Sequence, residues 1–181
     1  MQRTTQIAIP LLFLLSCACA STLPNRSTLG ESFPAVQGNS LDGTSTRLPQ
    51  DVAGAPCILL IGYTQRSQFD IDRWILGLMQ LESQVRLIEI PTIEGLLPGL
   101  FANRIDEGMR GGIPREDWPS VVTVYGDATK IREFTGTESE SNARVLLLDG
   151  SGTVRWMTDR GYSASQVRAL HEATLNLGEQ P

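Results

Sequence analysis

One apolar run near the middle of the chain constrains the fold more than any other feature. Residues 57–63 hold no charged side chain, which is typical of a strand that is buried on both faces of a parallel sheet. Apolar residues then recur at helical spacing over 67–83, with Ser67 as the expected N-cap. A second apolar strand over 85–91 ends in proline. This order predicts a β-α-β unit with a right-handed crossover and two parallel strands.

The segments on either side of this unit complete an α/β pattern. Turn residues over 39–43 predict a small hairpin ahead of the main sheet. Helical spacing assigns Trp74, Met79 and Leu175 to apolar helix faces. After the unit we expect, in chain order, a broken helix over 93–108, a strand over 120–125, a short helix capped by Asp127, a strand over 143–148, a hairpin partner over 153–158 and a helix capped by Ser163. The fold class is therefore α/β, with a central mixed sheet flanked by helices.

The N-terminus carries an export signal. Residues 1–20 combine one basic residue, an apolar stretch and a run of small residues. Residues 14–17 resemble a bacterial lipobox, with Cys17 as the lipidated residue. Residues 18–20 also fit ordinary signal-peptidase cleavage before Ser21, in which case Cys17 is one small residue of a discarded leader. We favour the lipobox, which makes the mature chain an envelope lipoprotein.

The rest of the chain divides by composition. Residues 21–32 are rich in Ser, Thr, Asn, Pro and Gly and predict a flexible tether. Residues 33–177 are long enough for one domain with its own core, and 178–181 form a short tail. No segment of the mature chain has the apolar length that spans a bilayer.

Charge and composition exclude several function classes. The net charge is −5 and the basic residues are not clustered, which excludes a nucleic-acid-binding surface. His171 is the single histidine, which excludes a multi-histidine metal site, and we expect no cofactor. Of the three cysteines only Cys57 lies in the folded body, within the apolar run, where we expect a buried and inert thiol.

The predicted order of elements resembles the thioredoxin superfamily in its redoxin and peroxiredoxin-like form, over about residues 33–177. More narrowly, seven short motifs are similar to the mitochondrial ATP synthase assembly-factor family. They lie at 33–34 with 41–43, 67–74, 108–110, 125–126, 131–132, 147–149 and 154–156. That resemblance implies a thioredoxin-like fold without a redox motif. It also implies a membrane partner, such as a subunit of the ATP synthase membrane sector.

The redox dithiol of that fold is missing from the sequence. In a thioredoxin, the first strand of the β-α-β unit delivers two cysteines to a helix N-terminus, where a thiolate is stabilised. Here that place holds Thr64, Gln65, Arg66 and Ser67, and hydroxyls form no disulfide, so dithiol exchange cannot occur there. The corner is then either an anion- or peptide-binding site or a helix cap beside a solvated arginine. Residues 141–143 also stand where redoxins carry a cis-proline.

Four residues in the family-like motifs are candidates for a partner surface: Met109, Arg110, Arg155 and Trp156. Arginine beside tryptophan is typical of contact surfaces. The alternative is ordinary packing, in which Trp156 covers the sheet and Arg155 points to solvent.

These observations favour a non-catalytic binding or assembly factor for a membrane or envelope protein. Two alternatives stay open. The first is a redox enzyme that uses Cys57 or a partner's thiol, and rapid reaction of the native thiol would favour it. The second is a structural lipoprotein with no specific client.

Overall fold

The computed structural model describes residues 22–95 and 98–178. Cys17 and both predicted processing sites lie outside the described residues. Among the residues that are described, no helix has both the length and the apolarity needed to cross a membrane.

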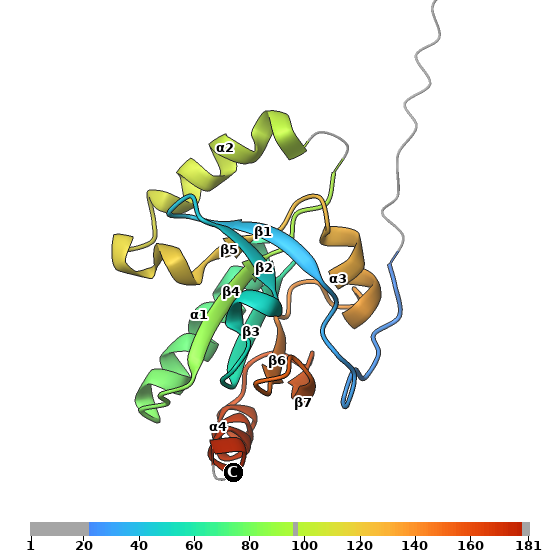
Figure 1. Ribbon diagram of the computed structural model, residues 1–181, viewed down its shortest axis with the longest axis vertical. Helices are drawn as coiled ribbons and strands as arrows, with labels where there is room; N and C mark the ends of the chain where they lie inside the picture. Colours follow the sequence, from blue (N-terminus) through green and yellow to red (C-terminus); the bar gives the residue numbers. More distant parts are fainter. Residues whose placement is uncertain (1–21, 96–97, 179–181) are drawn as a thin grey trace, which may run out of the picture.

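The centre of the domain is a four-stranded sheet in the order β4-β3-β6-β7 (Figure 1). β3 (Cys57–Gly62) and β4 (Arg86–Pro91) run parallel, on either side of α1 (Gln65–Gln80) in the sequence. β6 (Arg144–Leu148) is antiparallel to β3, and β7 (Val154–Thr158) is antiparallel to β6. The predicted β-α-β unit, terminal hairpin and mixed sheet are confirmed.

A smaller three-stranded sheet lies in the order β2-β1-β5. β1 (Val36–Ser40) and β2 (Ser45–Leu48) form the expected hairpin, and the short helix η1 (Gln50–Val52) follows. The strand expected over 120–125 is reduced to β5 (Val122–Thr123), because the 3-10 helix η2 (Arg115–Ser120) occupies the segment before it. Parallel bridges from residues 121 and 124 to residues 89 and 92 hold this segment beside β4.

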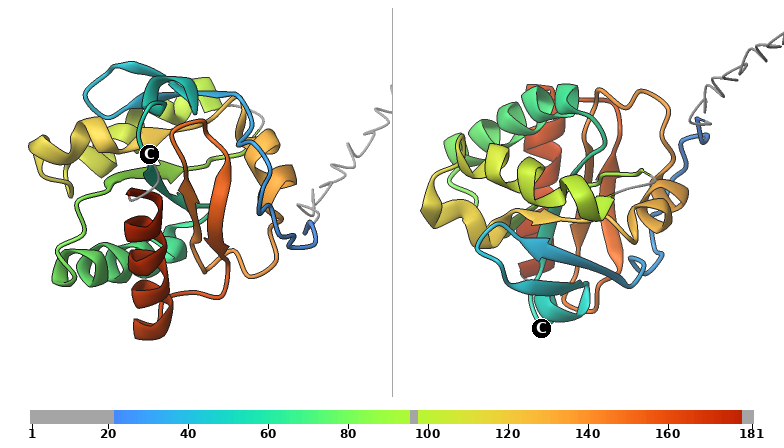
Figure 2. Two further views of the ribbon diagram at one scale, coloured as in Figure 1. Left: turned by 60° about the horizontal axis from the view of Figure 1, so that its bottom comes forward. Right: turned by 90° about the horizontal axis from the view of Figure 1, so that it is seen from above.

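Side chains of β3 alternate between two cores, as the pleat of a strand requires. Ile58 and Leu60 pack on one face with Trp74 of α1 and with α4 (Ala164–Gly178). Leu59 and Ile61 pack on the other face, with the N-terminal hairpin and α3 (Ala128–Thr135). Figure 2 shows α1 and α4 together on one side of the sheet. The burial predicted for Trp74 is confirmed, because its side chain is fully buried.

Several local predictions need correction. Helix α1 begins three residues earlier than predicted, because its N-cap is Thr64 rather than Ser67. Pro98 does not break a helix; it is the first residue of the 13-residue helix α2 (Pro98–Arg110), where proline is tolerated because its missing N–H would have no partner. Met79 and Leu175 are 65% and 55% exposed, since no element within residues 22–95 and 98–178 covers the edges of the faces on which they lie.

The segment before Phe33 is not a free tether in its described part. Leu23 donates its backbone N–H to the hydroxyl of Thr137 and accepts two backbone N–H groups in return. Thr28 is fully buried and hydrogen-bonds to the sulfur of Met157. The packed domain therefore begins at about residue 23, ten residues before the predicted boundary at 33.

Candidate functional site

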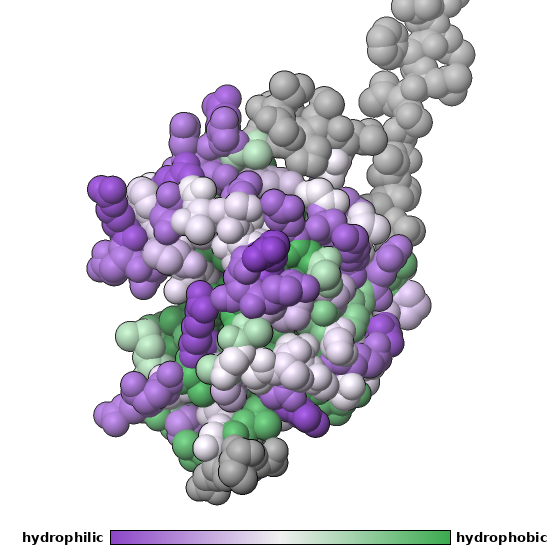
Figure 3. Space-filling model, viewed as in Figure 1, coloured by the Kyte–Doolittle hydropathy of each residue, from purple (hydrophilic) through white to green (hydrophobic). Residues whose placement is uncertain are grey.

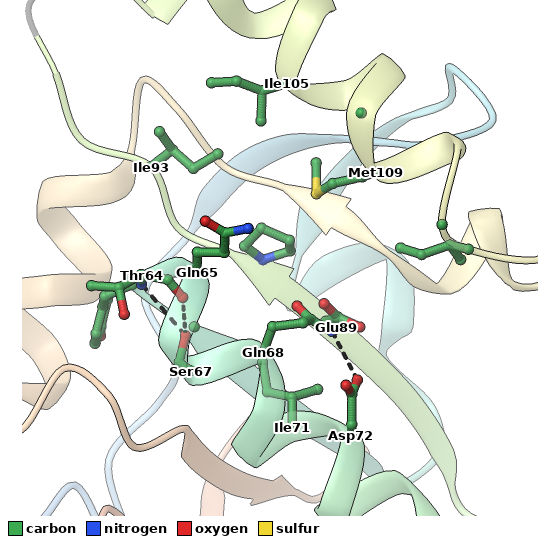
Figure 4. Close-up of a pocket in the computed structure, with 16 residues that line it drawn as sticks. Thr64, Gln65, Ser67, Gln68, Ile71, Asp72, Glu89, Ile93, Ile105 and Met109 are labelled. Carbon is green, nitrogen blue, oxygen red and sulfur yellow. Dashed lines mark hydrogen bonds between the residues drawn. The ribbon is translucent and has the colours of Figure 1, made fainter.

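A pocket of about 820 Å³ lies at the C-terminal ends of β3 and β4 (Figure 4). Its walls come from the first turns of α1, from the end of β4 and from α2 and the turn after it. The lining is mainly apolar on the α2 side and polar on the α1 side, and includes Gln65, Gln68, Asp72, Glu89, Ile93, Ile105, Met109 and Ile113. This is the edge of a parallel pair of strands at which α/β proteins place their sites.

The first turn of α1 has the conformation of a helix cap. The backbone N–H of Thr64 donates to Ser67 Oγ at 3.4 Å, and the Ser67 hydroxyl donates to the Thr64 carbonyl at 2.6 Å. Ser67 is 1% exposed, and its Oγ lies 2.6 Å from the place that a Cβ on Gly62 would occupy. Ser67 is therefore the buried partner of the N-cap Thr64 in a capping box, and Arg66 is exposed to solvent, so both follow the capping alternative. Gln65 instead faces the pocket.

The loop that replaces the cis-proline of redoxins is held against this corner. The hydroxyl of Thr64 donates to the carbonyl of Glu140 at 3.3 Å. Arg144 is fully buried and donates to the backbone carbonyls of Glu138, Ser139 and Asn142. The loop over 136–142 is thus fixed at this corner by side-chain hydrogen bonds to its backbone carbonyls.

Two arginines flank the ring of Tyr63, the residue next to this corner. The guanidinium carbons of Arg132 and Arg144 lie 5.3 Å and 5.5 Å from the ring centroid. The Tyr63 hydroxyl hydrogen-bonds to Thr135, and burial raises the pKa of the phenol to about 12. Arg132 also pairs with Glu140 at 2.8 Å, which joins the ring to the loop. Tyr63 is therefore a neutral structural residue at neutral pH.

The polar side of the pocket contains an unusual buried acid. Glu89 of β4 is 7% exposed, and its Oε1 has no hydrogen-bond partner among the described residues. Burial raises the pKa of Glu89 to about 7; the amide of Gln68 opposes the shift and the negative charge of Asp72 adds to it. Figure 4 shows these three side chains gathered at the base of the pocket, below those of α2.

The sequence did not single out Glu89 or Asp72. One signal was present, since Glu89 is the single acidic residue of a strand that is otherwise apolar toward its C-terminal end. Alternation alone would place such a residue in solvent on a sheet face. Here α1 lies over that face, with Gln68 and Asp72 beside Glu89, and the segment at Val121 pairs with the edge of β4, and only the tertiary structure reveals this.

The four residues predicted as a partner surface lie in two separate places. Met109 lines the pocket, and Arg110 donates to the Leu41 carbonyl at 2.7 Å, which fastens α2 to the hairpin turn. Trp156 packs edge-on against Trp74 with ring centroids 6.2 Å apart. Arg155 pairs with Asp149 at 2.7 Å and is half exposed. Only Met109 belongs to the pocket, so a role for the other three in partner binding stays a prediction.

The remaining chemistry-bearing residues lie away from the pocket. Cys57 is 1% exposed and begins β3, five residue steps or about 16 Å from Gly62 at the pocket. Burial raises the pKa of its thiol to about 11, as expected of an inert cysteine. His171 is half-buried on α4. Across residues 22–95 and 98–178, no three His, Cys, Asp or Glu side chains are grouped so that they could hold a metal ion.

Comparison with known proteins identifies the fold. No family model and no curated protein matches the chain. Yeast Sco1 with copper bound superposes with a TM-score of 0.58 and 14% identity, over 86% of this chain and 96% of that one. A SCO1/SenC family lipoprotein from Bacillus anthracis gives 0.55 and 15%, over 86% and 100%. The exposed lipoprotein thioredoxin Etrx1 from Streptococcus pneumoniae gives 0.53 and 11%, over 77% and 98%.

These similarities define the class of fold, which is thioredoxin-like, with a central mixed sheet flanked by helices. The predicted fold class is confirmed. The narrower resemblance to the ATP synthase assembly-factor family gains no support from the three relatives described, since two are Sco proteins and one is a thioredoxin.

Proposed function

We propose that this protein is a non-catalytic binding factor of the thioredoxin-like class that assists the assembly of a membrane or envelope protein. One observation carries the proposal. The N-terminus of α1 borders a pocket of about 820 Å³. The positions that would hold a redox dithiol are Thr64 and Ser67, and Ser67 is the buried partner of Thr64 in a capping box. A site that keeps its cavity and loses its nucleophile is suited to binding.

The structural relatives support an assembly role. One of them is BsSco, described as a member of the Sco family of cytochrome c oxidase assembly proteins, with a TM-score of 0.56 and 12% identity. Two others described above, Etrx1 and the SCO1/SenC family protein, are described as lipoproteins, and Etrx1 is described as exposed. An export signal with a lipobox at Cys17 would place this chain in the same kind of compartment, on the outer side of a membrane.

Among the described residues, the donor set at the pocket does not fit copper, which the yeast Sco1 structure contains. Copper favours thiolate, thioether and imidazole ligands, and of these the pocket holds only the thioether of Met109. Cys57 is buried at the far end of β3 and His171 lies on α4, so neither reaches the pocket. Assembly by copper delivery is therefore no part of the proposed function.

A redox enzyme is the rival function, and the structure offers little for it. The thiol of Cys57 is shielded from solvent, and its raised pKa keeps it protonated at neutral pH. Two further alternatives concern the client. In one, the client is a subunit in the membrane sector of ATP synthase; in the other, the protein is a structural lipoprotein without a client. A direct search for the partner separates these two alternatives.

The test is site-specific photo-crosslinking of the full-length chain in its own cells. The photoreactive residue replaces Ile105, which lines the pocket, or Arg168, which is exposed on α4 as a matched control. We expect one membrane or envelope protein to crosslink from position 105 and not from 168. The same proteins crosslinking from both positions, or none from either, would contradict the proposal. Mass spectrometry of the adduct then shows whether the client belongs to ATP synthase.

A further inference from the structure

We propose that the pocket binds a lysine or arginine side chain of an otherwise apolar segment of the partner, with Glu89 as its counter-charge. This inference deepens the function proposed above and rests on it. It assigns a ligand class to the site and a recognition role to Glu89 and Asp72.

The first argument is the unsatisfied carboxylate. Glu89 is more than nine-tenths buried, it lines the pocket, and its Oε1 has no hydrogen-bond partner among the described residues. An unpaired buried acid is costly for the folded protein and is retained where it has a use. A donor that enters from the pocket would supply the missing hydrogen bond.

The second argument is the sign of the local charge. Asp72 lies beside Glu89 and raises the pKa of Glu89 further, so the two negative charges repel each other. Neither carboxylate forms an ion pair with a lysine or arginine of the described residues. A cation between them relieves the repulsion, whereas a phosphate or carboxylate ligand would add to it.

The third argument is the apolar surface that surrounds the acids. Ile93, Ile105 and Ile113 line the opposite wall and can cover the aliphatic stem of a long cationic side chain. Outside the pocket, Phe69, Leu76 and Met79 of α1 are 69%, 58% and 65% exposed. Their spacing of seven and three residues keeps them on one side of the helix.

This exposed face continues the side of α1 that enters the pocket, because Leu76 follows Asp72 by four residues. Figure 3 shows a hollow beside hydrophobic residues at the position that α1 occupies in Figure 1. An extended or helical segment of the partner can therefore place its cation at Glu89 and its apolar residues along α1. A metal ion fits less well, since the described residues supply no group of three ligands.

The test uses the full-length mature protein and three synthetic peptides. Each is a nine-residue peptide of alanine and leucine, acetylated and amidated at its ends, with a central arginine, norleucine or glutamate. Binding is followed by NMR shifts of backbone amides at 65–72 and by titration to a dissociation constant. We expect the arginine peptide to bind in the pocket at least about tenfold more tightly than the norleucine peptide, and the glutamate peptide not to bind.

The variant that probes the acid is Glu89→Gln, with Glu133→Gln on the exposed side of α3 as the matched control. Glu89→Gln should weaken binding of the arginine peptide about 10- to 100-fold and leave binding of the norleucine peptide unchanged. Glu133→Gln should change the dissociation constant of neither peptide. Equal binding of all three peptides, no binding of any, or no effect of Glu89→Gln would overturn the inference.

The failure of this inference and that of the proposed function are distinguishable. If Ile105 crosslinks a single client in cells and Glu89→Gln leaves that adduct unchanged, the pocket binds a partner but not through a cation. If no client crosslinks from position 105, the proposed function itself fails, whatever the peptides do. Thermal unfolding of Glu89→Gln shows whether the variant is folded, and we expect it to be at least as stable as wild type.

Discussion

The carboxylate of Asp70 on α1 accepts a hydrogen bond at 3.0 Å from the backbone N–H of Ala143, at the start of β6. The same side chain accepts the N–H of Tyr162 at 2.8 Å and is 2% exposed. Two segments that are far apart in the sequence are thus fastened to one helix. The role of Asp70 is therefore tertiary.

Replacing Asp70 with alanine should therefore destabilise the domain strongly. Two buried backbone N–H groups lose their acceptor, so we expect the free energy of unfolding to fall by about 2–5 kcal/mol. Urea denaturation measures the change, and Glu133→Ala on an exposed position serves as control, with an expected effect within about 0.5 kcal/mol. Equal stability of the two variants would show that water replaces the carboxylate without cost.

Glu89 should make the stability of the protein depend on pH. Its pKa of about 7 lies above its ordinary value of 4.5, so the folded state holds the proton more tightly than the unfolded chain. The resulting stabilisation is complete below about pH 4.5 and is lost as the pH rises through 7. Glu89→Gln removes this titration. We therefore compare the free energy of unfolding of the variant with that of wild type. The difference, variant minus wild type, should increase by up to about 3 kcal/mol between pH 4.5 and 7.5.

Urea denaturation at several pH values measures that difference, with Glu133→Gln as a variant whose difference should stay flat. A flat difference for Glu89→Gln as well would mean that the carboxyl ionises in the folded state as easily as in the unfolded chain.

Cys57 should react with a thiol reagent only after unfolding. A pKa raised from 9.0 to about 11 lowers the thiolate fraction at pH 8 by about 100-fold, and burial blocks approach of the reagent. Mass spectrometry of the peptide that contains Cys57 should find this thiol unlabelled in the native protein and fully labelled in the urea-unfolded protein. Rapid labelling of the native state would revive the redox alternative.

Cysteines introduced at positions 64 and 67 should form a disulfide at the N-terminus of α1. Thr64 and Ser67 are the N-cap and the third residue of α1, and this spacing brings two Cα atoms within the range that a disulfide spans. The double variant Thr64→Cys, Ser67→Cys should lose two hydrogens on mild oxidation, as seen by mass spectrometry. The pair Gln65→Cys, Arg66→Cys should not, because adjacent residues point to different sides of a helix.

The sequence predicts well those parts of the fold that depend on continuous apolar patterns. The run over 57–62 and the strand over 86–91 need burial on both faces, and this requirement sets the β-α-β unit. Trp74 was placed correctly by helical spacing, but the same spacing placed Met79 in the core. Periodicity identifies the apolar face of a helix, but it does not show how much of that face other elements cover.

The candidate site was predictable only in part. The corner at residues 64–67 follows from the resemblance, and the loss of its thiols can be read directly from the sequence. Glu89 could not be found, because its burial depends on how α1 packs on β4 and on a segment more than thirty residues away that pairs with β4 at Val121. The hydrogen bonds of residues 23–32 were also invisible, since a polar segment of that composition is typical of a linker.

If Cys17 carries a lipid anchor, as the lipobox predicts, the bound N-terminal segment limits how far the domain can move from the membrane. Leu23 is held by Thr137, so in a lipoprotein anchored at Cys17 only six residue steps join the lipid to the folded body, a contour of at most about 21 Å. A free segment up to residue 33 would allow sixteen steps, or about 56 Å. A connection of this length favours clients that are embedded in the same bilayer or protrude little above it. It excludes contact with clients that lie far from the membrane surface.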